Sequence, residues 1–439
     1  MLGGKSRPGC SAKGMATCRI TIYIEGEEFM FKVGAKTTSA LLSICLLMAG
    51  LLLLSPASAQ AGAPDKILIG TTVSESGYMA EDSIPSFKGR QLAVDLVNKD
   101  GGLFLSKFNK KVPVKLVYYD DKSEPSSAVR SFQRLANMDK VDFFLSAHGS
   151  TLSFAVAKIA ETNKIPMTIY AGYANKIWTQ GYKYIFNVGP TASQYCKAFV
   201  NLVKSLPDKP KVGLIHEDGL WAKAVSGAMA KLGKAEGVQI DVVDVYPSDS
   251  KDVSSSVNKV IAGGYPIIGT VSHVRNDLLV TRTILEMGAG NKFKMIYVQT
   301  ATGYPSFAQK FKPEQIQGIV GTSVWASSIK TYFNTEFQAA YKKAYGEEPS
   351  WVSAIGFAGA QAMLEAIKDA GTNDREAVRQ AFMTKDIKTI LGNLKFQKDG
   401  TSDGSALVCP QMQGGIPEVV FPTAFATKKL IYPQPTYKK

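Results

Sequence analysis

From residue 66 onward, short apolar runs rich in β-forming residues alternate with segments whose apolar residues recur at helical spacing. Strands are predicted at residues 66–73, 112–119, 141–145 and 164–170. Helices are predicted at residues 87–98, 126–138 and 150–162. Such regular alternation is typical of a parallel sheet covered by helices on both faces.

The alternation starts again after residue 190. The second series consists of a helix at 193–206, a strand at 211–216, a helix at 221–236, a strand at 238–245, a helix at 253–262, a strand at 267–271, a helix at 278–287 and a strand at 294–298. Two helices within 334–370 and a strand at 406–412 follow. The sequence therefore predicts an α/β protein of two Rossmann-like lobes in series, and a last segment whose packing partner the pattern does not indicate.

One apolar run near the start differs from all these elements. Residues 40–54 read ALLSICLLMAGLLLL, with Lys32 and Lys36 before them and the small residues 57–59 after them. A basic region, a short apolar core and small residues, in this order, are typical of a secretory signal peptide. A membrane-spanning helix needs about 20 apolar residues, which is more than this run offers.

The position of this run sets the expected processing of the chain. A signal peptide begins a protein, so we predict that translation starts at Met30 and that residues 1–29 are an extension outside the functional protein. Residues 30–59 are then the signal peptide, with cleavage after Ala59. The mature protein is expected to be exported and soluble.

Composition and charge narrow the class of protein. The 439 residues are 45% apolar and 20% charged, which is ordinary for a globular protein. The formal net charge is +14, but the basic residues are mixed with acids, so we expect no nucleic acid partner. Of the five cysteines, Cys196 and Cys409 remain after processing. In an oxidising compartment they can form a disulfide or stay free thiols, and the sequence leaves both alternatives open.

A search for catalytic and metal-binding patterns yields one weak match. The chain has three histidines, no HExxH pattern and no cysteine pairs at zinc-binding spacing. Residues 400–404 fit GxSxG, but they lie in a polar turn and not between a buried strand and a helix, as a nucleophile elbow requires. We therefore expect no catalytic residues, no metal site and no cofactor, and the sequence favours a binding protein.

Several short features, in their order and spacing, resemble one family. They are Ile69-Gly70 leading to Ser76-Gly77, Gly89 in the first helix with Asn98 and Gly101-Gly102 at its end, Tyr119-Asp120-Asp121, residues 146–150, Ile165-Pro166, His216-Glu217-Asp218, and the turn from Phe396 to Gly400. The chain resembles the periplasmic solute-binding proteins of branched-chain amino acid ABC importers, which have the type I periplasmic binding fold.

The resemblance implies two lobes joined by a hinge of three crossings, with the ligand bound between them. The lobe boundaries it implies are 65–188 plus 324–404 for lobe 1, 189–323 plus 405–426 for lobe 2, and a tail at 427–439. The partners it implies are a small-molecule ligand and the membrane permease of the importer, and we expect a monomer. A sensory module that presents its closed form to a receptor is an alternative.

In open α/β sheets, ligands bind beyond the carboxyl ends of the strands, and this rule selects the loops that follow the predicted strands. Ser150 and Thr151 open a helix after the third strand, where a hydroxyl and helix amides suit a carboxylate. The resemblance implies that Ser150 binds the ligand carboxylate. Gly172 and Tyr173 follow the fourth strand and are expected to contact the ligand.

The other expected contacts come from both lobes. Tyr78 and Asp82 lie in the loop after the first strand. The resemblance implies that Trp221 covers the ligand, that His273 lies in a contacting loop and that Trp325 lies near the hinge, where it contacts the ligand or packs. An indole can stack on a ring or cover an aliphatic chain.

Thr300 marks a departure from the family. Amino acid binders carry an acid here that pairs with the ligand ammonium, whereas residues 299–302 contain no carboxylate. We therefore hypothesise a small carboxylate or amide without an α-ammonium, with an aromatic acid among the candidates. A branched-chain or other amino acid remains the alternative if Asp82 or Glu81 supplies the missing charge.

Overall fold

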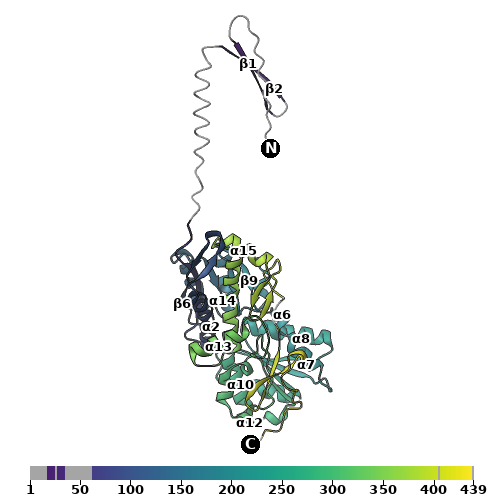
Figure 1. Ribbon diagram of the computed structural model, residues 1–439. Helices are drawn as coiled ribbons and strands as arrows, with labels where there is room; N and C mark the ends of the chain where they lie inside the picture. Colours follow the sequence, from purple (N-terminus) through teal and green to yellow (C-terminus); the bar gives the residue numbers. More distant parts are fainter. Residues whose placement is uncertain (1–16, 25–26, 35–61, 404–405, 438–439) are drawn as a thin grey trace. The chain divides into compact units, whose positions relative to one another are not determined.

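The computed structural model describes residues 17–24, 27–34, 62–403 and 406–437 (Figure 1). Two units separate by their contacts, residues 1–62 and residues 63–439. In the first unit β1 (Thr17–Ile24) pairs antiparallel with β2 (Glu27–Gly34), and Met30 lies within β2 opposite Thr21. The apolar core of the predicted signal peptide and its cleavage site lie outside the described residues, so the signal peptide and the start at Met30 stay predictions.

The second unit contains a five-stranded sheet in which every pairing is parallel. Its strands, in spatial order, are β6 (Val114–Asp120), β3 (Ile67–Val73), β7 (Phe143–Leu145), β8 (Met167–Ile169) and β9 (Ile185–Asn187). Leu145 belongs to one core cluster and its neighbour Phe144 to another, as expected where successive side chains point to opposite faces. Both faces of this sheet are therefore buried.

Helices cover the two faces of the five-stranded sheet. On one face α2 (Ala80–Lys99) packs along α14 (Trp351–Ala370), which belongs to the segment whose packing the sequence left open (Figure 1). On the other face lie α3 (Pro125–Asn137) and α4 (Ser150–Thr162). Helix α4 has the predicted bounds, whereas α2 begins seven residues before its predicted start and contains Pro85.

A second sheet has four parallel strands in the order β11-β10-β12-β13. These are β10 (Val212–Glu217), β11 (Ile240–Tyr246), β12 (Ile267–Val271) and β13 (Met295–Val298). Val320 extends the sheet, because it bridges Tyr297 of β13 to Gln411 of β16. Strand β16 (Cys409–Gln413) pairs antiparallel with β17 (Ile416–Phe421). The helices of this lobe are α6 (Ala192–Tyr195), α7 (Lys197–Lys204), α8 (Leu220–Glu236), α9 (Ser254–Ala262) and α10 (Val274–Glu286).

Shorter elements complete the described part of the chain. They are β4 (Leu103–Leu105), β5 (Lys110–Val112), α5 (Asn175–Trp178), α11 (Pro305–Lys310), α12 (Pro313–Ile316), α13 (Asn334–Tyr345), α15 (Arg375–Thr384), β14 (Ile387–Thr389), β15 (Gly392–Leu394) and the 3₁₀ turns η1 (Ser106–Phe108), η2 (Gly290–Lys292), η3 (Ala301–Gly303) and η4 (Thr423–Phe425). Among the described helices, none combines the length and apolarity needed to cross a membrane.

Hydrogen bonds tie together the segments that pass between the two sheets. The Tyr195 hydroxyl donates to the Thr322 carbonyl at 3.0 Å, and Ser323 pairs with Val408 as an antiparallel bridge. The Ser402 hydroxyl donates to the Asn187 carbonyl at 2.7 Å. The serine of the GxSxG match is therefore a buried hinge residue. Two α/β lobes with a three-crossing hinge confirm the predicted fold class, while the exact lobe boundaries stay a prediction.

The two cysteines left open by the sequence are both free and buried, so the structure contradicts the disulfide alternative. The Cys196 thiol donates to the Ser193 carbonyl at 3.3 Å, and the Cys409 thiol faces Thr322 instead of Cys196. Burial raises the pKa of Cys196 to about 11 and that of Cys409 to about 12. Both thiols therefore stay protonated and poorly reactive near neutral pH.

The contact between α2 and α14 leaves no room for a side chain at two glycines. A Cβ added at Gly89 would lie 2.0 Å from the Ser353 carbonyl oxygen, and one at Gly356 would lie 2.0 Å from the Ser86 carbonyl oxygen. We predict that Gly89→Ala destabilises the protein by about 1–3 kcal/mol, because backbone atoms must move apart. Thermal melts check this against Gly227→Ala in α8, where nothing lies within 4 Å. Equal melting temperatures for the two variants would contradict the prediction.

Candidate functional site

A small pocket lies where the carboxyl ends of the two parallel sheets face each other. The side chains and backbone that line it are Asp82, His148, Gly149, Ala171, Tyr173, Trp221, His273, Thr300, Trp351 and Ile355. All but those of α2 and α14 follow directly after strands β7, β8, β10, β12 and β13. The pocket therefore occupies the position that the strand-end rule assigns to a ligand in open α/β sheets.

Five of the residues that the sequence singled out meet in this pocket. They are Asp82, Tyr173, Trp221, His273 and Thr300. Three of the remaining five lie beside it: the Tyr78 ring packs edge-on to His273 with 6.1 Å between centroids, and Gly172 and Ser150 adjoin lining residues. Thr151 follows Ser150 in the first turn of α4. The Ser150 hydroxyl oxygen accepts from the Ala174 amide at 3.1 Å and so holds the loop after β8.

Trp325 is the one predicted residue that the structure does not bring to the pocket. Its indole N–H donates to Asn334 Oδ1 at 2.7 Å, and its ring packs edge-on to Phe337. The structure thus shows packing next to α13, which was the other role considered for this residue.

Five lining residues were not singled out by sequence reasoning. His148, Gly149 and Ala171 lie in loops that the strand-end rule selects. The sequence analysis chose their neighbours Ser150 and Gly172 from the same loops. Trp351 and Ile355 come from the first turns of α14, which no strand precedes. The local signal at α14 was limited to Ser350, whose side chain caps the helix by accepting from the Ser353 amide.

The N-terminus of α4 and His273 form an electropositive corner of the pocket. Gly149, the residue before α4, has φ +84°, and no side chain caps the helix. The amides of the first turn have no partners within the helix and carry a partial positive charge. A Cβ built on Gly149 would lie 2.6 Å from Met79 Cε and 3.9 Å from His273 Nε2, so the imidazole lies close to the helix end and the thioether of Met79 packs against the same residue.

A buried ion pair keeps His273 charged. His273 Nδ1 bonds to Glu217 Oε1, and Glu217 Oε2 accepts from the His273 amide at 3.2 Å and from Asn276 Nδ2 at 2.8 Å. Burial opposes the charge on His273, but the charge and hydrogen bond of Glu217, together with the charges of Asp82 and Asp277, outweigh burial and raise the pKa of His273 to about 9. The imidazolium is therefore present at neutral pH, and it directs Nε2 toward the pocket.

Asp82 is the acid that reaches the pocket. The Tyr304 hydroxyl donates to Asp82 Oδ1, whereas Oδ2 is buried without a partner among the described residues. Burial raises the pKa of Asp82 to about 6, against a weaker opposing effect of His273. A small change of pH near neutrality therefore changes the charge of this wall.

The loop at Thr300 lacks an acid of its own, as the sequence indicated, but an acid from α10 lies behind it. Asp277 Oδ2 accepts from the Thr300 amide at 2.7 Å, from the Thr300 hydroxyl at 2.8 Å and from the Ala301 amide at 3.1 Å. The Ser272 hydroxyl donates to the other oxygen at 2.6 Å. Asp277 therefore shapes the loop from inside, and it is not among the residues that line the pocket.

Several bonds connect the two walls of the cleft. The Trp351 indole N–H donates to the Thr300 carbonyl at 3.2 Å, and Lys310 Nζ lies 3.2 Å from Glu81 Oε1. The bond from Tyr304 to Asp82 also crosses from one lobe to the other. The free volume inside the pocket is about 20 Å³, room for about one water molecule. The structure thus has its lobes closed on each other.

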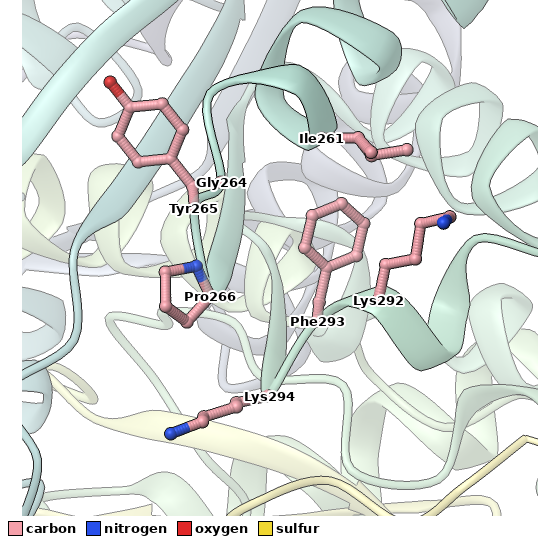
Figure 2. Close-up of a pocket in the computed structure, with 7 residues that line it drawn as sticks. All are labelled: Ile261, Gly264, Tyr265, Pro266, Lys292, Phe293 and Lys294. Carbon is pink, nitrogen blue, oxygen red and sulfur yellow. The ribbon is translucent and has the colours of Figure 1, made fainter.

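A larger hollow of about 240 Å³ lies elsewhere in the second lobe (Figure 2). Its lining includes Pro266 and Lys294, which precede β12 and β13, so it lies at the amino ends of the strands. Figure 2 shows the side chains of Lys292 and Lys294 pointing away from each other. This hollow lies opposite to the ligand-binding edge of the sheet, and its charged side chains diverge. The smaller pocket is therefore the candidate site. Among the described residues no cluster of three or more potential metal ligands occurs.

Comparison with known proteins agrees with this geometry. A family model described as periplasmic binding protein matches residues 66–409. A Leu/Ile/Val-binding protein homolog 8 of Brucella abortus is 26% identical over 385 residues, covering 83% of this chain and 92% of the relative.

Solved structures show the same fold. The branched-chain amino acid transporter substrate binding protein LivJ from Streptococcus pneumoniae, in complex with isoleucine, has a TM-score of 0.71 at 22% identity and covers 81% of this chain and 100% of its own. A solute binding protein of an ABC transporter from R. palustris, in complex with benzoate, has a TM-score of 0.69 at 16% identity and covers 81% of this chain and 95% of its own.

The match of the family model spans most of the chain, and the fold, the hinge and the strand-end pocket are those expected from the resemblance in sequence. The chain belongs to the periplasmic binding protein family and has the fold of the solute-binding proteins of branched-chain amino acid ABC transporters.

Proposed function

We propose that this protein is exported to the periplasm, where it binds a small organic carboxylate without an α-ammonium and delivers it to the membrane permease of an ABC importer. The family supports the role in transport. The basic residues and the apolar run before residue 60 support export. The ligand class rests on the chemistry of the pocket.

One observation carries the ligand class. The uncapped N-terminus of α4 lies close to His273, whose positive charge is maintained by Glu217. Helix amides and an imidazolium are both donors, and together they bind an anionic oxygen strongly. The two buried acids of the second lobe near the pocket already have partners, since Glu217 bonds to His273 and Asp277 to the Thr300 loop. This corner therefore suits a carboxylate.

The walls around this corner favour a flat apolar body on the ligand. Trp221, Trp351 and Tyr173 all line the pocket, and the Trp221 and His273 rings are 5.2 Å apart. Aromatic side chains stack well on rings and bury a large apolar area. An aromatic acid fits this combination, and a relative of the same fold is described in complex with benzoate.

A second candidate ligand is an amino acid, and the observation that favours it is the unpartnered Oδ2 of Asp82. An ammonium placed there would gain a charged hydrogen bond and would compensate a buried carboxylate. In this case Asp82 would take the role of the acid that the Thr300 loop lacks. The relative in complex with isoleucine shows that the fold accommodates such ligands.

We predict that benzoate and hydroxycinnamates raise the melting temperature of a protein of residues 60–439, whereas Leu, Ile, Val, urea and short amides leave it unchanged. A ligand at 100 times its dissociation constant adds about 2.7 kcal/mol to the free energy of unfolding, which gives a measurable shift. A shift with Leu or Val and none with the acids would reject the proposed ligand class and support the amino acid candidate. A shift with no compound of the panel would count against both.

The titration of Asp82 separates the two candidates by the sign of the pH dependence. Its pKa near 6 means that the carboxyl gains a proton between pH 7.5 and 5.5. A carboxylate ligand without an ammonium is then repelled less, so we predict that its affinity increases as the pH falls. An ammonium ligand would lose its partner, and its affinity would decrease. Calorimetric titrations measure this, and Asp82→Asn should abolish the dependence, whereas Glu81→Gln should retain it.

The titration of His273 predicts a second change of ligand affinity, at higher pH. Its charged form dominates below its pKa of about 9, so affinity for a carboxylate should stay level from pH 7 to 8 and fall as the pH rises through 9. His273→Gln should bind more weakly at pH 7.5 and lose this decline. The matched control is His216→Gln, since His216 is buried and bonds to the Glu217 carbonyl without lining the pocket. If the affinity of His273→Gln still declines as the pH rises through 9, the decline belongs to another titrating group.

A further inference from the structure

A stripe of polar residues runs along the buried face of α2. Asp82, Ser86 and Arg90 are spaced four residues apart, so they lie on one face of the helix. All three are buried, with exposed fractions of 2% or less. Asp82 Oδ2, Ser86 Oγ, Arg90 Nε and Arg90 Nη2 have no hydrogen-bond partner among the described residues. The stripe begins in the pocket, at Asp82, and leads away from it.

Arg90 is a fully buried cation that forms no ion pair with any residue the structure describes. Its Nη1 donates to the Thr71 hydroxyl and, at 3.1 Å, to the Thr72 carbonyl. The nearest acid connects only through Thr72, whose hydroxyl donates to Asp121 Oδ2 at 2.6 Å. No salt bridge of the described residues includes Arg90. The guanidinium thus has donors left over and no counter-ion in contact.

The ends of two strands face this stripe with further unpaired groups. Ser146 and His148 follow β7, and Tyr170 follows β8. The unpartnered atoms are Ser146 Oγ, His148 Nδ1 and Tyr170 OH. The Arg90 guanidinium lies over the Tyr170 ring at 4.9 Å, and the His148 and Tyr170 rings are 6.0 Å apart. We call Asp82, Ser86, Arg90, Ser146, His148 and Tyr170 the Arg90 track.

The energetics argue against a purely structural role for the track. A buried polar group without a partner costs about 1–3 kcal/mol, and a buried charge costs more. Arginine cannot escape this cost by losing its proton at physiological pH. A buried charge without its partner destabilises, and an apolar residue of similar size is often the more stable choice. The track also lies at the ligand-binding edge of the sheet, and two of its members, Asp82 and His148, line the pocket.

We propose that Arg90 binds a second anionic group of the ligand, so that the ligand of this protein is a dicarboxylate. This inference rests on the proposed function, because the first carboxylate occupies the corner between α4 and His273. The second carboxylate enters along the Arg90 track, where Arg90 Nε and Nη2 can donate to its two oxygens in the paired geometry that a guanidinium favours. Ser86 and Tyr170 hydroxyls supply further donors.

The geometry of α2 limits the length of such a ligand. Asp82 and Arg90 are separated along the helix axis by about 12 Å, at 1.5 Å per residue. Side chains lean toward the N-terminus of their helix, so the guanidinium lies closer to the pocket than its Cα does. The axial distance sets only an upper limit on the separation of the two anion positions, so the candidates are short ligands such as an aliphatic dicarboxylate or a benzene dicarboxylate.

Wild-type protein tests the inference directly with matched pairs of compounds. Calorimetry compares glutarate with pentanoate, adipate with hexanoate and terephthalate with benzoate, each pair differing in the second carboxylate. We expect at least one dicarboxylate to bind about 10–100-fold more tightly than its partner, the gain of one hydrogen-bonded charge pair. Monocarboxylate binding with no preference in any pair would overturn the inference and leave the proposed function intact. Absence of binding by every carboxylate would overturn the proposed function as well.

Variants assign the preference to the guanidinium. Arg90→Met should reduce the affinity for the dicarboxylate to about that of its monocarboxylate partner, and Arg90→Lys should retain part of the preference because the charge remains. The control is Arg130→Met, since Arg130 is exposed on α3. A ligand-free melting temperature of Arg90→Met equal to or above the wild type is expected. A lower melting temperature with the preference intact would show that Arg90 is a structural residue, and would overturn the assignment.

Discussion

Two parallel sheets meet by their carboxyl ends, and this arrangement buries the polar residues that end their strands. Each such group needs a partner, because an unpaired buried charge costs far more free energy than most contacts return. Glu217 meets this requirement through His273 and Asn276, and Asp277 does so through four donors around Thr300. Closure of the lobes therefore depends on how the charged groups of the cleft are paired.

The pairing leaves an uneven balance of charge around the pocket. In the second lobe the two buried acids Glu217 and Asp277 are bonded to protein donors, whereas His273 directs Nε2 to the pocket beside the N-terminus of α4. In the first lobe, within the part of the chain that the structure describes, Arg90 has no counter-ion in contact and one oxygen of Asp82 has no hydrogen-bond partner. Burial raises the pKa of Asp82 to about 6, so this acid can lose its charge when an anion approaches. This balance of charge is the physical basis of the proposed anionic ligand.

Part of this could be predicted from the sequence. Strand ends follow from apolar periodicity, and the strand-end rule then selected Asp82, Tyr173 and His273 without any coordinates. Trp351 and Ile355 could not be found in this way, because α14 reaches the cleft from the last third of the chain and follows no strand. The role of Asp277 was hidden for a related reason: it lies in the helix after one strand and acts on the loop after another.

The missed start of α2 has a different cause, and it bears on function. Apolar periodicity detects a buried helical face only where that face is apolar, yet the first turns of α2 bury Asp82, Ser83 and Ser86. The helix was therefore predicted to begin only at residue 87, after the polar stripe. A segment that is buried although its pattern is polar departs from the rule that local pattern and packing agree, and such departures concentrate at functional sites. The same residues that concealed the helix connect the pocket to Arg90.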